Sequence, residues 1–339
     1  MSMIKYIIRR LLAMIPVLFG VLTLTFILSR FMPGDPVLAY LPEGRVSPQL
    51  YRQVVHNLGL DQPIYIQYFR YLGDLFTGNW GISISIAQGL GVWDLIMVSL
   101  PRTVDLAVLS MIIAAFIGIK TGVISAKHRN KARDTIFRGM SLIGVAVPVF
   151  FLGMLLQYTV GYLVPIFPTT GFKTYSYTDP PFVTGFRWLD ALISGQIYMV
   201  SDYLYHLILP VFCLSFISLA GIVRQTRSSM LEVLEQDYVR TARAKGCKEK
   251  DVINTHARKN AMIPTVTVIG LSFAGLLAGA VLTETTFGLN GIGQLLVQAI
   301  RNSDYWVLNG LVFFFAIIFV MVNLITDLIY GMLDPRIRY

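Results

Sequence analysis

The sequence predicts an all-α membrane protein with six transmembrane helices. Its 339 residues are 55% hydrophobic and only 14% charged, with a mean hydropathy of +0.63, values far outside the usual range for a soluble globular protein. Six apolar stretches are long enough to cross about 30 Å of hydrocarbon, which takes roughly 20 helical residues each. The predicted spans cover residues 11–31, 104–126, 139–164, 203–223, 263–283 and 306–329.

The positions of lysine and arginine predict the orientation of these spans, because positively charged residues in short loops stay on the cytoplasmic side. The cations gather before the first span, in the second and fourth loops between spans, and after the last span. They include Lys5, Arg9, Arg10, Lys127, Arg129, Lys131, Arg133, Arg138, the run from Arg224 to Lys259, Arg336 and Arg338. Both termini are therefore expected in the cytoplasm, and the net charge of +9 indicates topology rather than nucleic-acid binding.

The chain is expected to have three regions. Residues 1–31 form an N-terminal anchor helix, which we expect to be retained because the apolar segment lacks a small-x-small cleavage site. Residues 32–103 form an extracytoplasmic loop region, and residues 104–339 form a core of five helices that includes a cytoplasmic loop over residues 224–262.

The loop region 32–103 is predicted to be partly helical. Ser47 is suited to cap a helix that starts at Pro48, and Gly59 is suited to end it. A second helix is expected from Pro63 to Phe76, because large apolar residues recur on one face. These residues are Tyr65, Phe69, Leu72 and Phe76. Such helices can pack as a lid on the first two spans, lie along the bilayer surface or cap the mouth of a pathway.

Ionisable residues within the predicted spans are few. Asp105 and Lys120 lie near opposite ends of the second span, where we expect their side chains to reach the lipid headgroups. In the fifth span, small residues recur at Gly270, Gly275 and Gly279. Small residues allow another helix to approach closely. The pattern favours a helix contact, and it also fits a face that lines a pathway between subunits.

The loop over residues 224–262 contains a short polar and basic helix between two long apolar segments. A capping box is predicted at Ser229–Glu232, Asp237 is the expected N-cap of the short helix, and Gly246 fits its C-terminal stop. A second helix is expected from about Lys248 into the fifth span. A helix of about eight residues is unstable alone in water, so contacts within the protein or with a partner must hold it.

The predicted face of this short helix suits a protein partner. It combines an aromatic residue, small residues that permit close approach, and cations. The residues are Tyr238, Ala242, Lys245, Arg240 and Arg243. The alternative is a positively charged cytoplasmic loop that merely happens to be helical.

The segment Tyr238–Gly246, followed by His256–Asn260 and Pro264, closely resembles the signature loop of permease subunits of ATP-binding cassette importers, in the dipeptide and oligopeptide branch. The general form of that loop has Glu-Ala-Ala and then Gly after three residues. Arg240 and Thr241 replace its first two residues, and a later Leu-Pro is out of register, as in the peptide branch. Further landmarks of that branch occur in order along the chain. They are Pro33–Pro36, Leu58–Pro63, Gly78–Gly81, Thr283–Phe287, Gly291–Gly293 and Leu333–Arg336.

The resemblance implies that Tyr238–Gly246 is a coupling helix seated on a cytoplasmic ATPase. It implies two such ATPase subunits, a second permease subunit, a solute-binding protein outside the membrane and a peptide substrate. The machine would lie in a prokaryotic inner membrane, with ATP and Mg²⁺ bound by the ATPases and no cofactor on this chain. The residues assigned to ATPase coupling are Tyr238, Arg240, Thr241, Ala242, Arg243, Ala244, Lys245 and Gly246.

The absence of catalytic motifs from the sequence agrees with ATP binding by other subunits. The sequence has no Gly-x4-Gly-Lys-Ser/Thr phosphate loop, no Gly-x-Ser-x-Gly elbow and no Cys-x-x-Cys or His-Glu-x-x-His metal motif. The four histidines are scattered, so no metal site is expected. Two other classes remain as alternatives. A self-contained carrier or channel would need a coupling residue or polar pore of its own, and a membrane enzyme would need one of the missing motifs.

The residues that line a pathway are less defined. Candidates for the pathway or for helix interfaces are Gln157, Tyr158, Ser272, Gly275, Gly279 and Glu284. Each could instead satisfy a helix contact or a loop. Members of the family that the chain resembles also carry nickel chelates, glutathione or oligosaccharides. The partner permease can be a homologue or a second copy of this chain.

Overall fold

The computed structural model describes residues 3–31, 37, 41, 47–277 and 280–333. These residues form helices joined by loops, with no strand among them beyond one antiparallel bridge between Ile82 and Gly91. The α-helices are α1 (Met3–Phe31), α2 (Pro48–Leu58), α3 (Ile64–Phe76), α4 (Val92–Lys127), α5 (Ala132–Ala146), α6 (Val149–Leu156), α7 (Arg187–Ile193), α8 (Ile197–Leu234), α9 (Asp237–Ala244), α10 (Glu249–Asp251), α11 (Arg258–Leu277), α12 (Val281–Phe287), α13 (Ile292–Arg301) and α14 (Tyr305–Leu333). Two π-helical turns, Gln157–Leu163 and Val252–Ala257, continue α6 and precede α11.

Five helical segments in the described part of the chain are long and apolar enough to cross a membrane. They are Arg10–Arg30, Val92–Lys127, Ile197–Leu234, Glu249–Leu277 and Tyr305–Thr326. A sixth candidate consists of α5 together with α6 and its π-helical turn, which are bent by 98° relative to each other. The prediction of an all-α membrane protein is confirmed, with the third predicted span broken in two.

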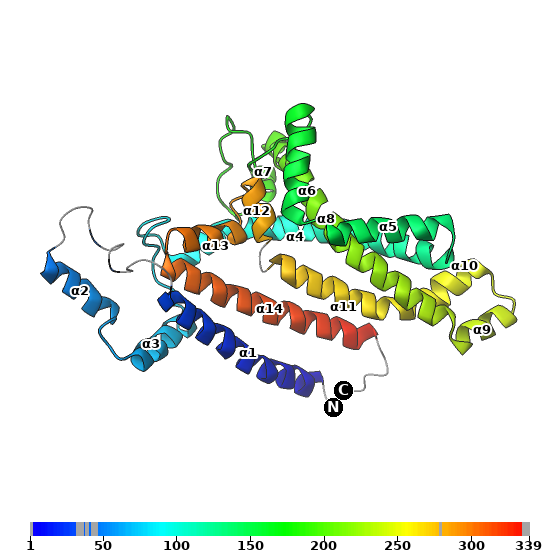
Figure 1. The fold of residues 1–339 in the computed structure, drawn as a ribbon, viewed down its shortest axis with the longest axis horizontal. Helices are drawn as coiled ribbons and strands as arrows, with labels where there is room; N and C mark the ends of the chain where they lie inside the picture. Colours follow the sequence, from blue (N-terminus) through cyan, green and yellow to red (C-terminus); the bar gives the residue numbers. More distant parts are fainter. Residues whose placement is uncertain (1–2, 32–36, 38–40, 42–46, 278–279, 334–339) are drawn as a thin grey trace.

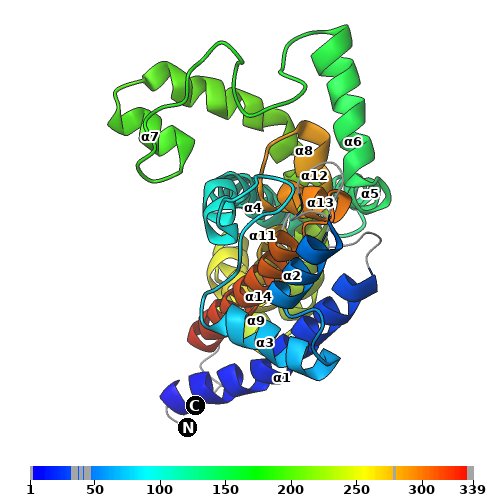
Figure 2. The same cartoon turned by 90° about the vertical axis from the view of Figure 1, so that its left-hand side faces the viewer.

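Pro148 explains the break in the third span. Proline lacks an N–H donor and pushes the residue before it out of the helical region. Val147 accordingly has φ −86° and ψ 121°, an extended conformation, and α6 starts immediately after Pro148. As a result α5 lies along the bundle, whereas α6 stands away from it (Figures 1 and 2).

The long helices run side by side along the longest axis of the molecule (Figure 1). The first residues of α1 and the last of α14 lie toward the end that carries α9 and α10, which we call the α9 end. Helices α2 and α3 lie toward the opposite end, which we call the α3 end. Seen from that end, α6 and α7 rise above the bundle and α1 lies on its opposite side (Figure 2).

Separate clusters of buried apolar residues hold the bundle together. One joins α1, α3, α4, α13 and α14 around Leu22, Ile96 and Leu311. A second joins α4, α8 and α12 around Leu106, Tyr203 and Phe287. A third lies at the α9 end and attaches α9 to the ends of α4, α8 and α11. Its members are Ala126, Met230, Val239, Ala242, Val252, Ile253, Ala257 and Ala261.

The two helices predicted in the region 32–103 are confirmed. The Ser47 hydroxyl accepts a hydrogen bond from the Leu50 N–H at 3.2 Å and so caps α2, whereas Gly59 ends it in the left-handed conformation with φ 67°. Helix α3 follows Pro63. Its predicted apolar face is divided, because Leu72 is buried whereas Tyr65, Phe69 and Phe76 are exposed.

One buried carboxylate anchors the loop before α4 to the start of α14. Asp304 Oδ2 accepts hydrogen bonds from the Ser83 hydroxyl at 2.6 Å and from the N–H groups of Ile84 and Ser85 at 3.0 and 3.1 Å. Because these bonds satisfy a fully buried charge, they fix the loop against the helix bundle.

Several predicted boundaries are corrected by the structure. Helix α4 begins at Val92, so the end of the predicted loop region up to Thr103 is helical. Helix α8 continues to Leu234 because Met230 packs into the cluster at the α9 end, so the capping box predicted at Ser229–Glu232 does not form. The fifth span is displaced toward its N-terminus: helix α11 ends at Leu277, and residues from Val281 form the separate helix α12.

The sequence predicted that Asp105 would reach the lipid headgroups, and the structure contradicts this. The Asp105 carboxylate is buried and accepts hydrogen bonds from Trp188 Nε1 at 3.0 Å and from the Tyr203 hydroxyl at 2.8 Å. A buried charge needs such partners, and it thereby ties α4 to α7 and α8. Gly279 and the segment Pro33–Pro36 lie outside the described residues.

Candidate functional site

Helix α9 is short, and its two ends are set by local hydrogen bonds. Gln236 is the N-cap and Asp237 is the first helical residue, which corrects the predicted N-cap by one position. Gly246 has φ 80°. Its N–H donates to the Arg243 carbonyl at 2.9 Å, and the Cys247 N–H donates to the Ala242 carbonyl at 3.2 Å. This pair of bonds is the Schellman motif, in which glycine suits the left-handed position, so the predicted stop is confirmed.

The two sides of α9 differ in their surroundings. Val239 and Ala242 are buried against the ends of α8 and α11. Ala242 therefore positions the helix from its inner side, in contrast to the outward-facing role predicted for it. The other residues assigned to coupling are exposed and form the outer face of α9. They are Tyr238, Arg240, Thr241, Arg243, Ala244, Lys245 and Gly246.

Two contacts fix this outer face relative to the segment that follows it. Arg243 forms a two-pronged ion pair with Glu249, with nitrogen–oxygen distances of 3.2 and 3.0 Å. The Asn260 amide donates to the Tyr238 hydroxyl at 2.8 Å. Each is exposed and adds little stability alone. Together with the buried side they attach α9 to the π-helical turn before α11 and to the first turn of α11.

A buried ion pair near the α9 end was not predicted from the sequence. Asp134 at the start of α5 has no exposed surface and accepts two hydrogen bonds from Arg227 of α8, at 2.7 and 3.0 Å. Ser125 of α4 and the Asn130 N–H also donate to it, at 2.6 and 2.9 Å. One carboxylate thus connects three helices. The only sequence signal was a lone acid within a basic loop.

Nearby, Arg129 Nη1 donates to Glu235 at 2.9 Å, joining the end of α4 to the turn just before α9. Both groups are more than half exposed, so this pair is weak by itself. The pair connects the turn after α4 with the turn that precedes α9.

Two pathway candidates that follow α6 have different surroundings. The Gln157 amide donates to the carbonyls of Thr169 and Thr286, at 2.6 and 3.0 Å, so it holds a loop against α12. Tyr158 is exposed and stacks on Tyr162. Tyr158 is therefore the more exposed residue of this pair.

Glu284 has a structural role. Its carboxylate is buried, accepts from the Thr103 hydroxyl at 2.7 Å and from the Gln294 N–H at 3.0 Å, and lies at the N-terminus of α13. A carboxylate there satisfies free N–H groups and interacts favourably with the helix dipole. The Thr103 hydroxyl also accepts from the Ile292 N–H at 2.9 Å. Glu284 thus fastens α13 to α12 and α4.

Comparison with known proteins decides the family. The family described as binding-protein-dependent transport system inner membrane component matches residues 118–339, and the N-terminal family of the same transport systems matches residues 3–107. The chain belongs to this family of permeases. It is therefore a multi-pass inner-membrane component of a transport system.

Relatives with curated names match the permease over nearly its whole length. It is 43% identical to the di/tripeptide transport system permease protein DppB of Pseudomonas aeruginosa, over 99% of both chains. It is 41% identical to the dipeptide transport system permease protein DppB of Escherichia coli, again over 99% of both. The oligopeptide transport system permease protein AppB of Bacillus subtilis is 38% identical, over 99% of this chain and 100% of its own.

The fold has a match among solved structures. A chain of the MetNI methionine ABC transporter, in inward-facing conformations, aligns with a TM-score of 0.54 and 15% sequence identity. The match covers 71% of the permease and 96% of that chain. At this identity the likeness supports the helical fold.

The glycines of α11 have different surroundings in the permease. A Cβ placed on Gly270 would lie 3.0 Å from Thr326 Cβ, so Gly270 lets α11 and α14 approach closely. A Cβ on Gly275 would meet no described atom within 4 Å, and Gly275 is exposed. Ser272 is half-buried on the same helix. Gly270 therefore mediates a contact within the chain, whereas Gly275 faces outward.

This difference gives a matched test. Replacing Gly270 with leucine is expected to destabilise the purified permease by about 1–3 kcal/mol, because the added side chain overpacks the contact with α14. Gly275→Leu is expected to leave the midpoint of thermal unfolding in detergent nearly unchanged. Equal losses for the two variants would contradict the assignment of Gly270 alone to the contact with α14.

Proposed function

We propose that this permease is the membrane subunit of an ATP-driven importer of di- or oligopeptides. The observation that carries the proposal is full-length similarity to three peptide permeases, at 38–43% identity, combined with a helix α9 whose outer face is polar and basic. Peptides are the substrates in the names of these relatives. Nickel chelates, glutathione and oligosaccharides are the alternative substrates of the same machine.

Helix α9 is the proposed contact with a cytoplasmic ATPase. It is attached to the transmembrane helices by buried Val239 and Ala242, and its exposed face carries Tyr238, Arg240 and Lys245. When two ATPase subunits close around ATP and Mg²⁺, α9 moves with them, and the contacts at Asp134 carry the displacement into α4, α5 and α8. A two-state membrane domain biased in this way alternates between inward-open and outward-open forms.

The remaining partners follow from the same proposal. The α9 end faces the cytoplasm, so both termini lie there and the α3 end faces outward. A solute-binding protein delivers the peptide at the α3 end. A second, homologous permease completes the pathway, and outward-facing residues such as Tyr158 and Gly275 are available to line it.

Affinity purification from detergent-solubilised membranes tests this assembly. We expect the tagged permease to recover a second permease and ATPase subunits that contain phosphate loops. After reconstitution with the binding protein, we expect uptake of a labelled dipeptide that requires ATP. If a nickel chelate, glutathione or an oligosaccharide competes with the uptake but peptides do not, the assignment of peptides as the substrate is overturned. Solute movement by this chain alone, without ATP, would establish a self-contained carrier instead.

A further inference from the structure

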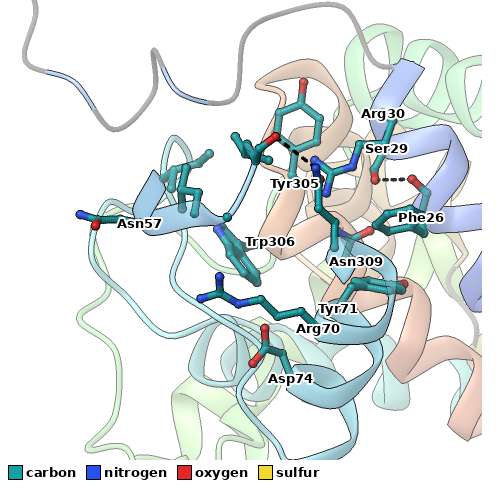
Figure 3. Close-up of a pocket in the computed structure, with 15 residues that line it drawn as sticks. Phe26, Ser29, Arg30, Asn57, Arg70, Tyr71, Asp74, Tyr305, Trp306 and Asn309 are labelled. Carbon is teal, nitrogen blue, oxygen red and sulfur yellow. Dashed lines mark hydrogen bonds between the residues drawn. The ribbon is translucent and has the colours of Figure 1, made fainter. Parts of the chain in front are cut away.

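A cavity of about 340 Å³ lies at the α3 end, between the last turns of α1, the turn after α2, helix α3 and the first turns of α14 (Figure 3). This volume is within the range of small-ligand sites. The segment of α1 that is long and apolar enough to cross a membrane ends at Arg30, and that of α14 begins at Tyr305. Both residues line the cavity, so it lies at the level of the lipid headgroups whichever way the chain is oriented.

The cavity contains charges of both signs. Arg30 and Arg70 line it together with Asp74, and Figure 3 shows these three side chains around its interior. The Arg30 guanidinium lies 5.0 Å from the centre of the Phe26 ring. One oxygen of Asp74 accepts from the Asn79 amide at 3.2 Å. Two guanidinium groups and one carboxylate suit a ligand that has an anionic group and a cationic group.

Two buried polar atoms of the lining have no hydrogen-bond partner among the described residues. They are the hydroxyl oxygen of Tyr71 on α3 and Oδ1 of Asn309 on α14. An unpaired buried polar atom costs about 1–3 kcal/mol, so native structures pair nearly all such atoms with protein, water or ligand. A ligand in the cavity that offers a donor to Asn309 and a donor or acceptor to Tyr71 removes this cost.

The surface around the cavity is apolar. On α3, Ile64, Tyr65 and Phe69 are more than three-fifths exposed, and on α1, Leu24 and Leu28 are more than half exposed. Side chains of this kind beside the ends of membrane spans are covered by lipid. A ligand with apolar tails can therefore place its headgroup in the cavity and keep its chains in the bilayer.

We propose that this cavity is a binding site for a phospholipid whose headgroup has both a phosphate and a primary ammonium. The phosphate pairs with Arg30 and Arg70, and the ammonium lies toward Asp74 and the Asn309 oxygen. A primary ammonium has three donors, whereas a trimethylated ammonium has none. The bound lipid connects α1, α3 and α14. The lipid site is defined by the cavity and the membrane-spanning helices alone, so it does not depend on the proposed transport substrate.

The test uses the full chain, delipidated in detergent and incubated with one phospholipid at a time before native mass spectrometry. We expect phosphatidylethanolamine to be retained about tenfold more than phosphatidylcholine, because charge-assisted hydrogen bonds from the ammonium are lost on methylation. The double variant Arg30→Gln, Arg70→Gln should lower retention of phosphatidylethanolamine about tenfold. Asp74→Asn should remove the preference over phosphatidylcholine. Arg52→Gln, an exposed arginine on α2 outside the cavity, should change neither result.

A second measurement separates lost binding from misfolding. Phosphatidylethanolamine should raise the midpoint of thermal unfolding of the wild type and of Arg52→Gln, but not that of the double variant. Equal retention of both lipids by the wild type, or unchanged retention by the double variant, would overturn the site. Tight binding of soluble phosphoethanolamine, with no advantage for the lipid, would identify a free small molecule as the ligand. Displacement of the bound phosphatidylethanolamine by detergent alone would indicate an adventitious additive only and would overturn the site.

Discussion

Replacing Arg227 with methionine is expected to lower the free energy of unfolding of the permease by about 3–5 kcal/mol, because the change leaves a buried carboxylate without its cation. Asp134 has no exposed surface, and Arg227 donates two hydrogen bonds to its carboxylate in a bidentate ion pair. The measurement is chemical denaturation in detergent micelles, with tryptophan fluorescence as the signal for unfolding. We also expect the helix contacts at the α9 end to unfold before the rest of the variant protein.

Two controls make this result specific. Arg138 also approaches Asp134, at 3.7 Å, but its side chain is about half exposed, so Arg138→Met should cost less than about 1 kcal/mol. The double variant Asp134→Leu, Arg227→Met removes both charges and should recover part of the loss, since an apolar pair can replace a buried ion pair. If the double variant is as unstable as Arg227→Met alone, the unpaired charge is not the cause.

Replacing Gly246 with valine is expected to weaken assembly of the permease with its ATPase while membrane insertion is retained. Gly246 has φ 80°, and a Cβ there would meet no described atom within 4 Å. The cost is therefore backbone strain, which for a residue with a Cβ is about 1–2 kcal/mol. If the strain displaces the end of α9, co-purification of the ATPase should fall roughly 5- to 30-fold.

Matched variants identify the cause of that loss. Gly246→Asn should retain most of the assembly, because asparagine tolerates the left-handed conformation. Gly89 is also left-handed, with φ 84° and open space around it, but it lies in the loop before α4. Gly89→Val should therefore leave ATPase recovery unchanged. Normal recovery with Gly246→Val would remove α9 as the coupling contact.

The features that the sequence determined by itself are local along the chain. Hydropathy and length identified the membrane spans, because about 20 apolar residues in a row have no other suitable solvent. The ends of α2 and α9 were predictable at Ser47, Gly59 and Gly246, since caps are made by hydrogen bonds between near neighbours. The order of motifs around Tyr238–Gly246 was sufficient to identify the family.

Only the tertiary structure decided which side chains meet. Pro148 signals an interruption in the sequence, but the angle of 98° between α5 and α6 is known only from the structure. Ala242 faces inward because Val239 beside it packs into the same cluster. Asp134 and Arg227 lie 93 positions apart, and Thr103 and Glu284 lie 181 apart. Pairings at such separations depend on how the helices are arranged in space, and a buried charge is stable only where that arrangement supplies its partner.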